Sequence, residues 1–314
     1  MVSVIIDKAD DGKQVHKWLR LLLPGMPLSG IHKFIRTGRI KVNGKRAKRD
    51  TVLHQGDAVN LYMTEEDYEA SRKRKREKFS GVQRNVDVRY EDDELVIVNK
   101  PAGTLVHSAD GTDYASTLQA QVEAYVHDRT EMKAGQAFSP APVHRLDRNT
   151  SGLVIFAKTS RAAKAFGEAF QSGVMEKDYI TLVTGTVRKP GKVAAALIRA
   201  NEEVTRVDER GKESYTSYEP VATAGGTTLL SVRIESGRTH QIRAHLSHIG
   251  HPLVGDVKYG ARRQPGETFY LHAAHLSVGH ELDVTAPLPG RFVRKLTSLG
   301  YRMQELQEML ARFS

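Results

Sequence analysis

The sequence predicts an α+β protein of two domains joined by a basic linker. Its 314 residues exceed what one small hydrophobic core needs. Apolar residues recur at helical spacing near the N-terminus and alternate at strand spacing from Val86 onward. Between these patterns, residues 63–85 lack apolar periodicity and contain the run Arg72–Arg76, whose charges repel one another. We therefore expect a small α/β domain at 1–62 and an α+β domain at 86–314, with a helical extension as the alternative to a linker.

Two short helices are expected in the N-terminal domain. The first ends at Pro24-Gly25, and its single apolar stripe consists of Val15, Trp18, Leu19, Leu22 and Leu23. The second is expected to begin at a Ser29 cap and to end before Gly38, which suits a left-handed C′ position. Its apolar face is formed by Ile31, Phe34 and Ile35.

Short strands are expected to complete this domain. Ile40–Val42 alternates apolar and basic residues, and the following Asn43-Gly44 favours a type I′ hairpin turn. Val59 and Leu61 indicate a further strand. The pattern predicts a compact unit of two helices and a hairpin.

The second domain mixes strands and helices along the chain. The expected strands are Val86–Tyr90, Leu95–Val98, Leu153–Ala157, Tyr179–Val183 and Leu229–Ile234. The expected helices are Leu118–Val126 and Ser160–Gln171, the latter ending at Gly173. This mixture predicts an α+β domain.

Composition narrows the classes of protein. The chain has no cysteine, which excludes disulfides, thiolate metal sites and cysteine nucleophiles. The N-terminus lacks the basic and apolar regions of a signal peptide, and no apolar run reaches the ~18 residues of a membrane-spanning helix. We expect a cytoplasmic protein that does not enter a membrane.

The positive charge is concentrated at the N-terminus. The net charge is +10, and residues 1–80 contribute +8, from 18 basic and 10 acidic side chains. Eight basic residues and no acid lie between Ile31 and Arg49, so this unit is expected to present one basic face. Such a face favours a nucleic acid as partner, because lysine and arginine neutralise phosphates; a merely solvated face is the alternative. The candidate RNA contacts are Lys33, Arg36, Arg39, Lys41, Lys45 and Arg46.

Three polar segments could carry chemistry. His144–Gly152 precedes an apolar strand and offers Asp147 as a reactive carboxylate. Gly237–Arg243 runs from a turn into a helix and could supply a partner for that carboxylate. Tyr179 opens a strand and could present its ring face to a planar ligand. Two of these segments also have a structural explanation: a loop ion pair for Asp147 and a buried backbone contact for His144 in the first, and strand packing for Tyr179.

Two other kinds of site fit the residues less well. A group of four histidines suggests zinc, but no acidic ligand lies within it and its spacing matches no zinc motif. Its members are His240, His245, His248 and His251. His144 and Ser151 beside Asp147 suggest a hydrolase, but a catalytic triad is assembled in space, and no G-x-S-x-G motif is present. We therefore expect no metal site.

Longer blocks of the sequence resemble the RluA-type pseudouridine synthases. The segment HRLDRNTSGLVIFAK at His144–Lys158 is similar to the signature of this family. Further blocks occur in the order typical of the family, over residues 86 to 290. They are Val98–Gly103 with Val106-His107, Lys177–Tyr179, Gly237–His245, Gly250–Asp256 with Tyr259-Gly260, and Leu271–Ala273. The N-terminal domain resembles, by shorter patterns, the S-four-type RNA-binding domain that precedes the catalytic domain in many members.

The resemblance implies a mixed, largely antiparallel sheet with an active site in a central cleft. It implies that uridine in RNA is converted to pseudouridine, with no cofactor and no metal. Asp147 would be the catalytic aspartate, acting either as a nucleophile at the sugar or the uracil or as a base at C2′. Arg243 would pair with Asp147, and Tyr179 would stack on the detached uracil and help to remove the C5 proton. Arg145 would occupy the gap left by the flipped base.

The resemblance also implies a class of RNA. The N-terminal domain and the stretch Arg206–Ser214 are similar to enzymes that act on large-subunit ribosomal RNA. A transfer RNA pseudouridine synthase of the same family is the alternative. A catalytically inactive RNA-binding protein is another, but it would lack Asp147, Tyr179 or Arg243, and all three are present. We expect a monomer.

Overall fold

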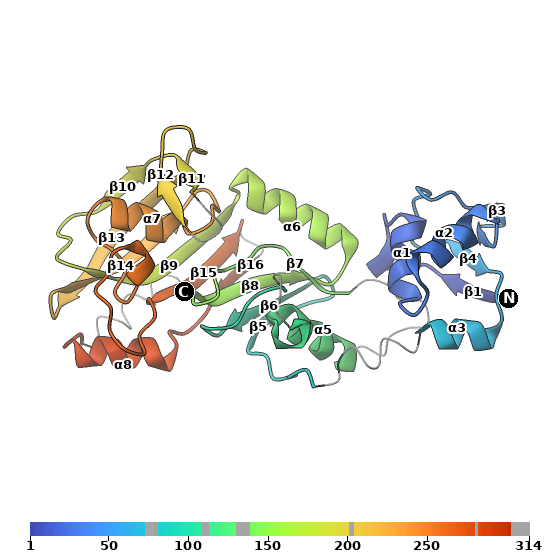
Figure 1. The fold of residues 1–314 in the computed structure, drawn as a ribbon, viewed down its shortest axis with the longest axis horizontal. Helices are drawn as coiled ribbons and strands as arrows, with labels where there is room; N and C mark the ends of the chain where they lie inside the picture. The colour runs from blue at the N-terminus through green and yellow to red at the C-terminus, as the bar shows by residue number, and fades with distance from the viewer. Residues whose placement is uncertain are drawn as a thin grey trace.

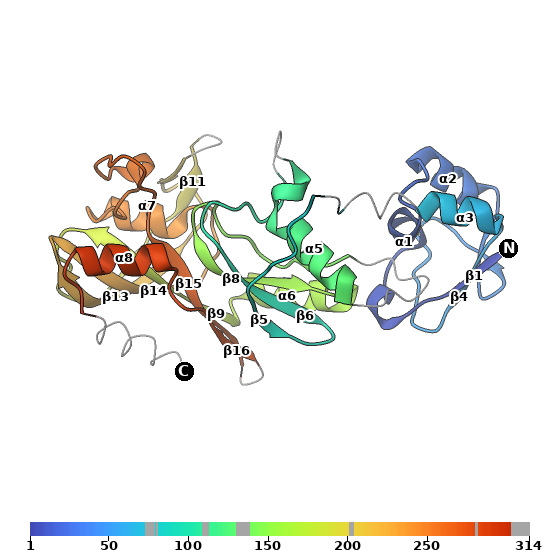
Figure 2. The ribbon, with the colours of Figure 1, turned by 90° about the horizontal axis from the view of Figure 1, so that it is seen from below.

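The chain forms a small N-terminal unit and a larger unit built on a long sheet. The computed structural model describes residues 1–72, 79, 81–108, 113–129, 139–200, 204–279 and 282–302. Figures 1 and 2 show the N-terminal unit at one end of the molecule, next to one end of the long sheet. The two units meet at an ion pair of 3.5 Å between Lys8 and Glu94.

The N-terminal unit is a four-stranded antiparallel sheet with helices packed on it. The strand order is β1-β4-β2-β3. The elements are β1 (Val2–Ile5), η1 (Lys8–Asp10), α1 (Val15–Leu22), α2 (Leu28–Arg36), β2 (Ile40–Val42), β3 (Lys45–Arg46), β4 (Ala58–Leu61) and α3 (Glu65–Arg72). The predicted helices and strands are confirmed. The sequence patterns do not predict β1, whose four residues pair with β4 more than 50 positions away.

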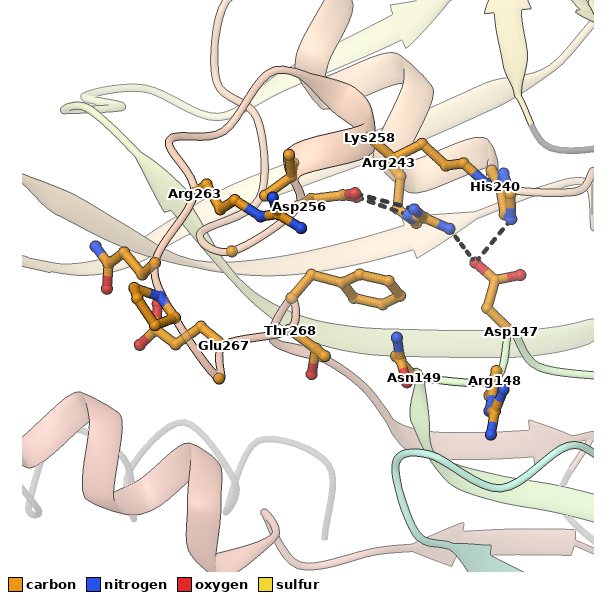
Figure 3. A pocket seen from close by; sticks show the side chains of 16 residues that line it. Asp147, Arg148, Asn149, His240, Arg243, Asp256, Lys258, Arg263, Glu267 and Thr268 are labelled. Carbon is orange, nitrogen blue, oxygen red and sulfur yellow. Dashed lines mark hydrogen bonds and ion pairs between the residues drawn. The ribbon is translucent and has the colours of Figure 1, made fainter.

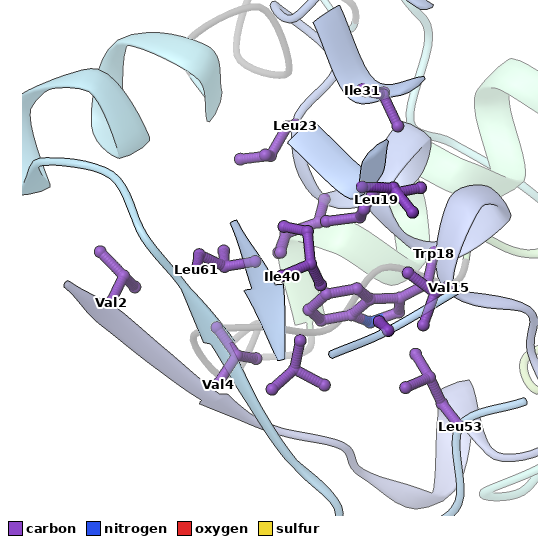
Figure 4. Close-up of a cluster of buried hydrophobic side chains, with 14 of the residues drawn as sticks. Val2, Val4, Val15, Trp18, Leu19, Leu23, Ile31, Ile40, Leu53 and Leu61 are labelled. Carbon is purple, nitrogen blue, oxygen red and sulfur yellow. The ribbon is translucent and has the colours of Figure 1, made fainter. Parts of the chain in front are cut away.

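The apolar stripes of α1 and α2 form the core of this unit (Figure 4). Trp18 is completely buried, and its indole Nε1 donates to Asp10 Oδ2 at 3.1 Å. Tyr68 of α3 belongs to the same core, although α3 begins within the predicted linker. Beyond α3, Phe79 and Val82 pack against α5 (Leu118–Arg129). Most of the charged run predicted there lies outside the described residues, and the boundaries at 62 and 86 stay predictions.

Local backbone geometry follows the predicted turns with one exception. Gly38 has a φ of +74° after α2, which confirms the left-handed end of that helix. Asn43 and Gly44 have φ of 49° and 78°, which confirms the type I′ turn. The Ser29 cap is wrong, because α2 already begins at Leu28 and the N-cap position is Pro27. The ring of Pro27 has no oxygen that could accept a hydrogen bond from the first turn.

The larger unit contains a ten-stranded sheet. Its order is β10-β13-β14-β9-β15-β8-β6-β5, with β16 beside β15 and β7 beside β8. The strands are β5 (Val88–Glu91), β6 (Leu95–Lys100), β7 (Ala141–Pro142), β8 (Ser151–Ala157), β9 (Met175–Thr184), β10 (Gly191–Ala194), β13 (Tyr215–Ala224), β14 (Thr227–Ile234), β15 (Leu271–Val278) and β16 (Leu282–Thr285). Among the described pairings only β15 with β8 is parallel. The predicted α+β class with a mixed, largely antiparallel sheet is therefore confirmed.

Helices cover both faces of this sheet (Figure 1). Besides α5 they are α6 (Ser160–Ser172), α7 (Gln241–His248) and α8 (Gly290–Ser298). Along β8, Ile155 packs with α6 and Phe156 with α5. Along β9, Tyr179 packs with α7 and Ile180 with α8. Since successive strand residues face opposite sides, α6 and α7 share one face and α5 and α8 the other.

The remaining described elements are short. They are η2 (Tyr114–Ser116), η3 (Val257–Tyr259) and the hairpin of β11 (Leu197–Arg199) with β12 (Thr205–Val207). The predicted end of α6 is confirmed, because Gly173 has a φ of 78°. Among the described helices, none is long and apolar enough to cross a lipid bilayer.

Candidate active site

Asp147 lies on the loop between β7 and β8 with 24% of its side chain exposed. Lys100, at the end of β6, is fully buried beneath this loop. Its Nζ donates to the carbonyl oxygens of Pro101, Thr104 and Arg148 at 3.1, 2.8 and 3.0 Å. Burial lowers the pKa of Lys100 to about 7, although the Asp147 carboxylate opposes this shift. The backbone next to Asp147 is therefore fixed by a buried amine.

Arg243 of α7 bridges Asp147 and a second carboxylate (Figure 3). Its Nη1 donates to Asp147 Oδ2 at 3.0 Å, while Nε and Nη2 donate to the buried Asp256 at 2.6 and 2.9 Å. The rings of Tyr259 and Phe269 have their centroids 4.7 and 4.3 Å from the guanidinium carbon. Burial alone would lower the pKa of Arg243, but the two carboxylates outweigh it and the pKa is raised. Arg243 is thus a fixed cation that faces Asp147.

His240 stands beside Asp147 at the start of α7. Its φ of 55° lies in the left-handed region, which is strained for a residue with a side chain. Its Nδ1 bonds with the hydroxyl of Tyr259 at 2.9 Å, and its Nε2 lies 3.7 Å from Asp147 Oδ2. The buried amide of Gln241 fixes this turn, since it bonds with the backbone of Arg238 and with β13. Burial is the main reason that the pKa of His240 is lowered, so its ring is neutral at neutral pH.

A narrow cleft between α6 and α7 contains Asp147. Its lining includes Arg145, Asp147, Phe170, Tyr179 and Arg243. Tyr179 is buried, and burial together with the Asp147 carboxylate raises the pKa of its phenol. The Phe170 ring is stacked on His144 with 5.2 Å between centroids, and Lys177 Nζ lies 4.1 Å from the Phe170 centroid. The cleft therefore has aromatic walls next to an ion pair.

The structure brings together four residues that the resemblance singles out: Arg145, Asp147, Tyr179 and Arg243. Sequence reasoning gives no role to Lys100, His240 or Asp256, although each lies in a block or cluster that it names. No spacing rule connects Asp256 to Arg243, because the turn between α7 and η3 sets their geometry. The left-handed backbone of His240 has no sequence signal.

Comparison with known proteins identifies the family. The model of the RNA pseudouridylate synthase family matches residues 94–248. Ribosomal large subunit pseudouridine synthase C of Vibrio vulnificus strain CMCP6 is 32% identical over 94% of this chain and 96% of its own. The chain belongs to the RNA pseudouridylate synthase family. The enzyme of the same name from Escherichia coli K12 is also 32% identical to this chain, over 95% of this chain and 96% of the E. coli enzyme.

Solved structures of human proteins share the pseudouridylate synthase fold. The human RNA pseudouridylate synthase domain containing 4 matches with a TM-score of 0.58 and 21% identity, over 68% of this chain and 92% of that chain. The human RNA pseudouridylate synthase domain containing 1 matches with a TM-score of 0.56 and 24% identity, over 73% and 95%. This likeness shows the fold alone.

The hydrolase alternative does not fit this pseudouridylate synthase. The His144 Nε2 accepts a hydrogen bond from the Ile155 amide at 3.2 Å, and burial lowers the pKa of His144 to about 3. Ser151 Oγ bonds with His272 Nδ1 at 2.9 Å, away from Asp147. Neither side chain is placed to act with Asp147. Among the four histidines considered as zinc ligands, His245 uses both of its ring nitrogens in hydrogen bonds, one with Thr216 and one with a backbone carbonyl.

Two of the predicted RNA contacts lie together in the N-terminal unit. Arg36 and Arg46 line a hollow of about 570 Å³, and Lys48 and Arg49 line it with them. The guanidinium of Arg46 also donates to the backbone carbonyl of Arg36, which ties β3 to the end of α2. The hollow therefore gathers four cations from α2 and from the chain around β3.

The other predicted contacts point elsewhere. Arg39 lines a second hollow with Phe34, whose ring centroid lies 5.6 Å from the guanidinium carbon. Lys41 Nζ lies 5.1 Å from the ring centroid of Tyr62. Lys33 and Lys45 are exposed outside both hollows. The predicted basic residues are thus distributed over more than one part of the surface, two of them beside aromatic rings.

Proposed function

We propose that this chain isomerises uridine to pseudouridine in large-subunit ribosomal RNA, with Asp147 as the catalytic residue. The observation that carries the proposal is the contact between Asp147 and Arg243 in a cleft that also contains Tyr179. The ribosomal substrate is supported by two relatives that are 32% identical over nearly their whole length and are named as pseudouridine synthases of the ribosomal large subunit.

The proposed reaction rearranges one base without gain or loss of atoms. The bond between N1 and C1′ breaks, the uracil turns, and C5 bonds to C1′; C5 then loses a proton and N1 gains one. Asp147 can begin by attacking as a nucleophile or by removing the C2′ proton, and either role requires an ionised carboxylate. Arg243 orients this carboxylate through a charge-assisted hydrogen bond. Lys100 keeps the loop in place while the substrate binds.

Arg145 is proposed to stabilise the flipped conformation of the target. It is exposed, and it lines the cleft two residues before Asp147. A uridine must flip out of its base stack before a carboxylate can reach its sugar. The gap that it leaves in the stack exposes the faces of the neighbouring bases. The planar guanidinium of Arg145 can stack there. This role requires a flexible side chain at the surface, which is where Arg145 lies.

Two substitutions of Tyr179 should separate its stacking from its hydroxyl chemistry. Tyr179→Phe keeps the ring, so we expect KM for RNA to change less than about twofold while kcat falls on the order of tenfold or more. Tyr179→Ala removes both, so KM should rise as well. Burial and the Asp147 carboxylate raise the pKa of this phenol, so it keeps its proton and can assist the C5 proton transfer only as a hydroxyl relay that gives one proton as it takes another, a function that Tyr179→Phe removes. Equal effects of the two substitutions on KM would contradict the stacking role.

The N-terminal unit is proposed to be an RNA-binding domain of the S-four type at 1–62, separate from the catalytic domain at 86–314. Its four clustered cations should add phosphate contacts without choosing the base. Each lost phosphate contact lowers the slope of log K against log salt by about 0.7 to 0.9. Arg36→Gln with Lys48→Gln should therefore weaken RNA binding and flatten this slope.

Salt titrations of RNA binding check that prediction in the full chain. Arg20→Gln is the control, because Arg20 is exposed on α1 and does not line the hollow. It should lower the slope less than the paired substitution. An unchanged slope for Arg36→Gln with Lys48→Gln would assign the hollow to something other than RNA.

Mapping pseudouridines in cells with and without the gene tests the proposed function. We expect one or more pseudouridines to disappear from large-subunit ribosomal RNA and to return with the wild-type gene. Loss from transfer RNA alone would favour the transfer RNA alternative. No change in either RNA, together with RNA binding by the purified protein, would favour an inactive RNA-binding protein.

A further inference from the structure

A larger hollow adjoins the narrow cleft at Asp147, and it is separate from the two hollows of the N-terminal unit. Its volume is about 770 Å³, and it shares Asp147, His240 and Arg243 with the cleft that contains Tyr179. The rest of its lining comes from Arg148-Asn149 and from the chain between Gly255 and Phe269 (Figure 3). The proposed reaction at the uracil uses the Tyr179 side only. This larger space therefore has no role in the chemistry described above.

The carboxylates of this hollow already have cationic partners. Asp256 accepts two hydrogen bonds from Arg243, which also donates to Asp147. Glu267 pairs with Lys295 at 2.5 Å. Arg243 is a single cation shared by two carboxylates, so these contacts leave about one uncompensated negative charge in the lining.

Three further cations line the same hollow: Arg148, Lys258 and Arg263. Arg148 is oriented by a hydrogen bond of 3.0 Å from its Nε to the Gly103 carbonyl. Arg263 is exposed and makes no ion pair within the part of the chain that the structure describes. The hollow therefore offers positive charge to a ligand, and Arg263 can contribute its whole guanidinium fork.

The lining favours a sugar-phosphate over a base. Its lining has two aromatic rings, those of Phe269 and His240. The Phe269 ring is buried against the guanidinium of Arg243. The His240 ring packs edge-on against Tyr259, with its two nitrogens next to the Tyr259 hydroxyl and Asp147. A stacked base would need an accessible aromatic face, whereas phosphate is bound by arginine and lysine. The other polar groups, such as Asn149 and Thr268, suit ribose hydroxyls.

The position of Asp147 connects the two hollows through the substrate. Asp147 attacks the sugar, removes its C2′ proton, or attacks the uracil that is attached to it, so in each route the target ribose lies at or next to the point where the hollows meet. Its uracil occupies the side of Tyr179. The phosphates attached to the same ribose must then lie on a different side of Asp147 from the uracil. The cationic hollow begins at this place.

We propose that the hollow lined by Arg148, Lys258 and Arg263 binds a phosphodiester adjoining the target uridine, with Arg263 as its main contact. This inference rests on the proposed function, because it takes RNA uridine as the substrate. It assigns to the loop between Gly255 and Phe269 the positioning of the RNA backbone at the active site. The uracil cleft and the N-terminal unit bind other parts of the same RNA.

A substrate-modification cycle tests the proposal with the full-length protein. The substrates are a short RNA with the target uridine and two versions in which one flanking phosphate or the other is an uncharged methylphosphonate. For the wild type, one replacement should lower kcat/KM roughly tenfold, since a charge-assisted phosphate contact is lost. Arg263→Gln should lower kcat/KM by a similar factor on the unmodified RNA. On the methylphosphonate RNA that lowers kcat/KM of the wild type, kcat/KM of this variant should fall little further.

Arg262→Gln is the matched control, because Arg262 is the exposed neighbour that does not line the hollow. It should respond to the replacements as the wild type does, and all variants should melt at the same temperature. If the effects of Arg263→Gln and of each replacement multiply, the phosphate is bound elsewhere and the proposal is wrong. If the wild type is active but indifferent to both replacements, the proposal alone fails. A wild type that cannot modify any unmodified RNA overturns the proposed function as well.

Discussion

Asp147→Asn is expected to abolish pseudouridine formation while stability and RNA affinity stay close to those of the wild type. The amide has nearly the shape of the carboxylate but cannot attack a sugar carbon or accept its proton, so turnover should fall on the order of 10³-fold or more. Arg243 keeps its two hydrogen bonds to Asp256 in this variant, and the loop keeps its anchor on Lys100. The surroundings of the substituted side chain are therefore preserved.

Single-turnover formation of pseudouridine, thermal melting and RNA binding measure these three properties separately. Asp93→Asn is a matched control, because it makes the same chemical change at an exposed turn of the same domain. It should leave all three unchanged. Turnover by Asp147→Asn within about tenfold of the wild type would show that another group carries the reaction.

Local periodicity predicts several elements whose burial is one-sided, although it misses β1. The stripe containing Val15 and Trp18 specifies α1, and the alternation before Asn43-Gly44 specifies the hairpin, because each pattern separates a core side from a solvent side. Strand β8 is buried on both faces and is predicted from its continuous apolar run, but β15 escapes prediction because the buried His272 and His275 interrupt its apolar pattern. Its polar residues bond inside the protein, which no periodicity indicates.

The sequence predicts only part of the candidate site, for a similar reason. Family blocks point to Asp147 and Arg243, which are 96 positions apart, and imply that they pair, but they do not give the geometry of the contact or its second anchor at Asp256. The contact depends on how α7 is placed against β9 and on Asp256, which fixes the other side of the guanidinium. The packing of the whole sheet sets this geometry, so local sequence patterns do not specify it.

Arg243→Ala is expected to lower both stability and activity strongly. Asp256 is only 2% exposed and would lose both of its hydrogen bonds to Arg243, which leaves a buried charge without its partner. Breaking a buried ion pair in this way destabilises a protein by about 3 to 5 kcal/mol. Activity should fall as well, because Asp147 loses the cation that orients it. Lys192→Ala is the control for stability, since its pair with Glu235 is half-exposed and should matter little.

A double variant separates the two roles of Arg243. Arg243→Met with Asp256→Leu removes both members of the buried pair, so no unpaired charge remains and the apolar side chains can fill the space between Tyr259 and Phe269. Most of the lost stability should return in chemical unfolding, while pseudouridine formation should stay as low as in Arg243→Ala. A double variant as unstable as the single one would mean that Asp256 is not the source of the instability. A double variant with restored turnover would mean that Asp147 needs no cationic partner, and the proposed orientation by Arg243 would then be wrong.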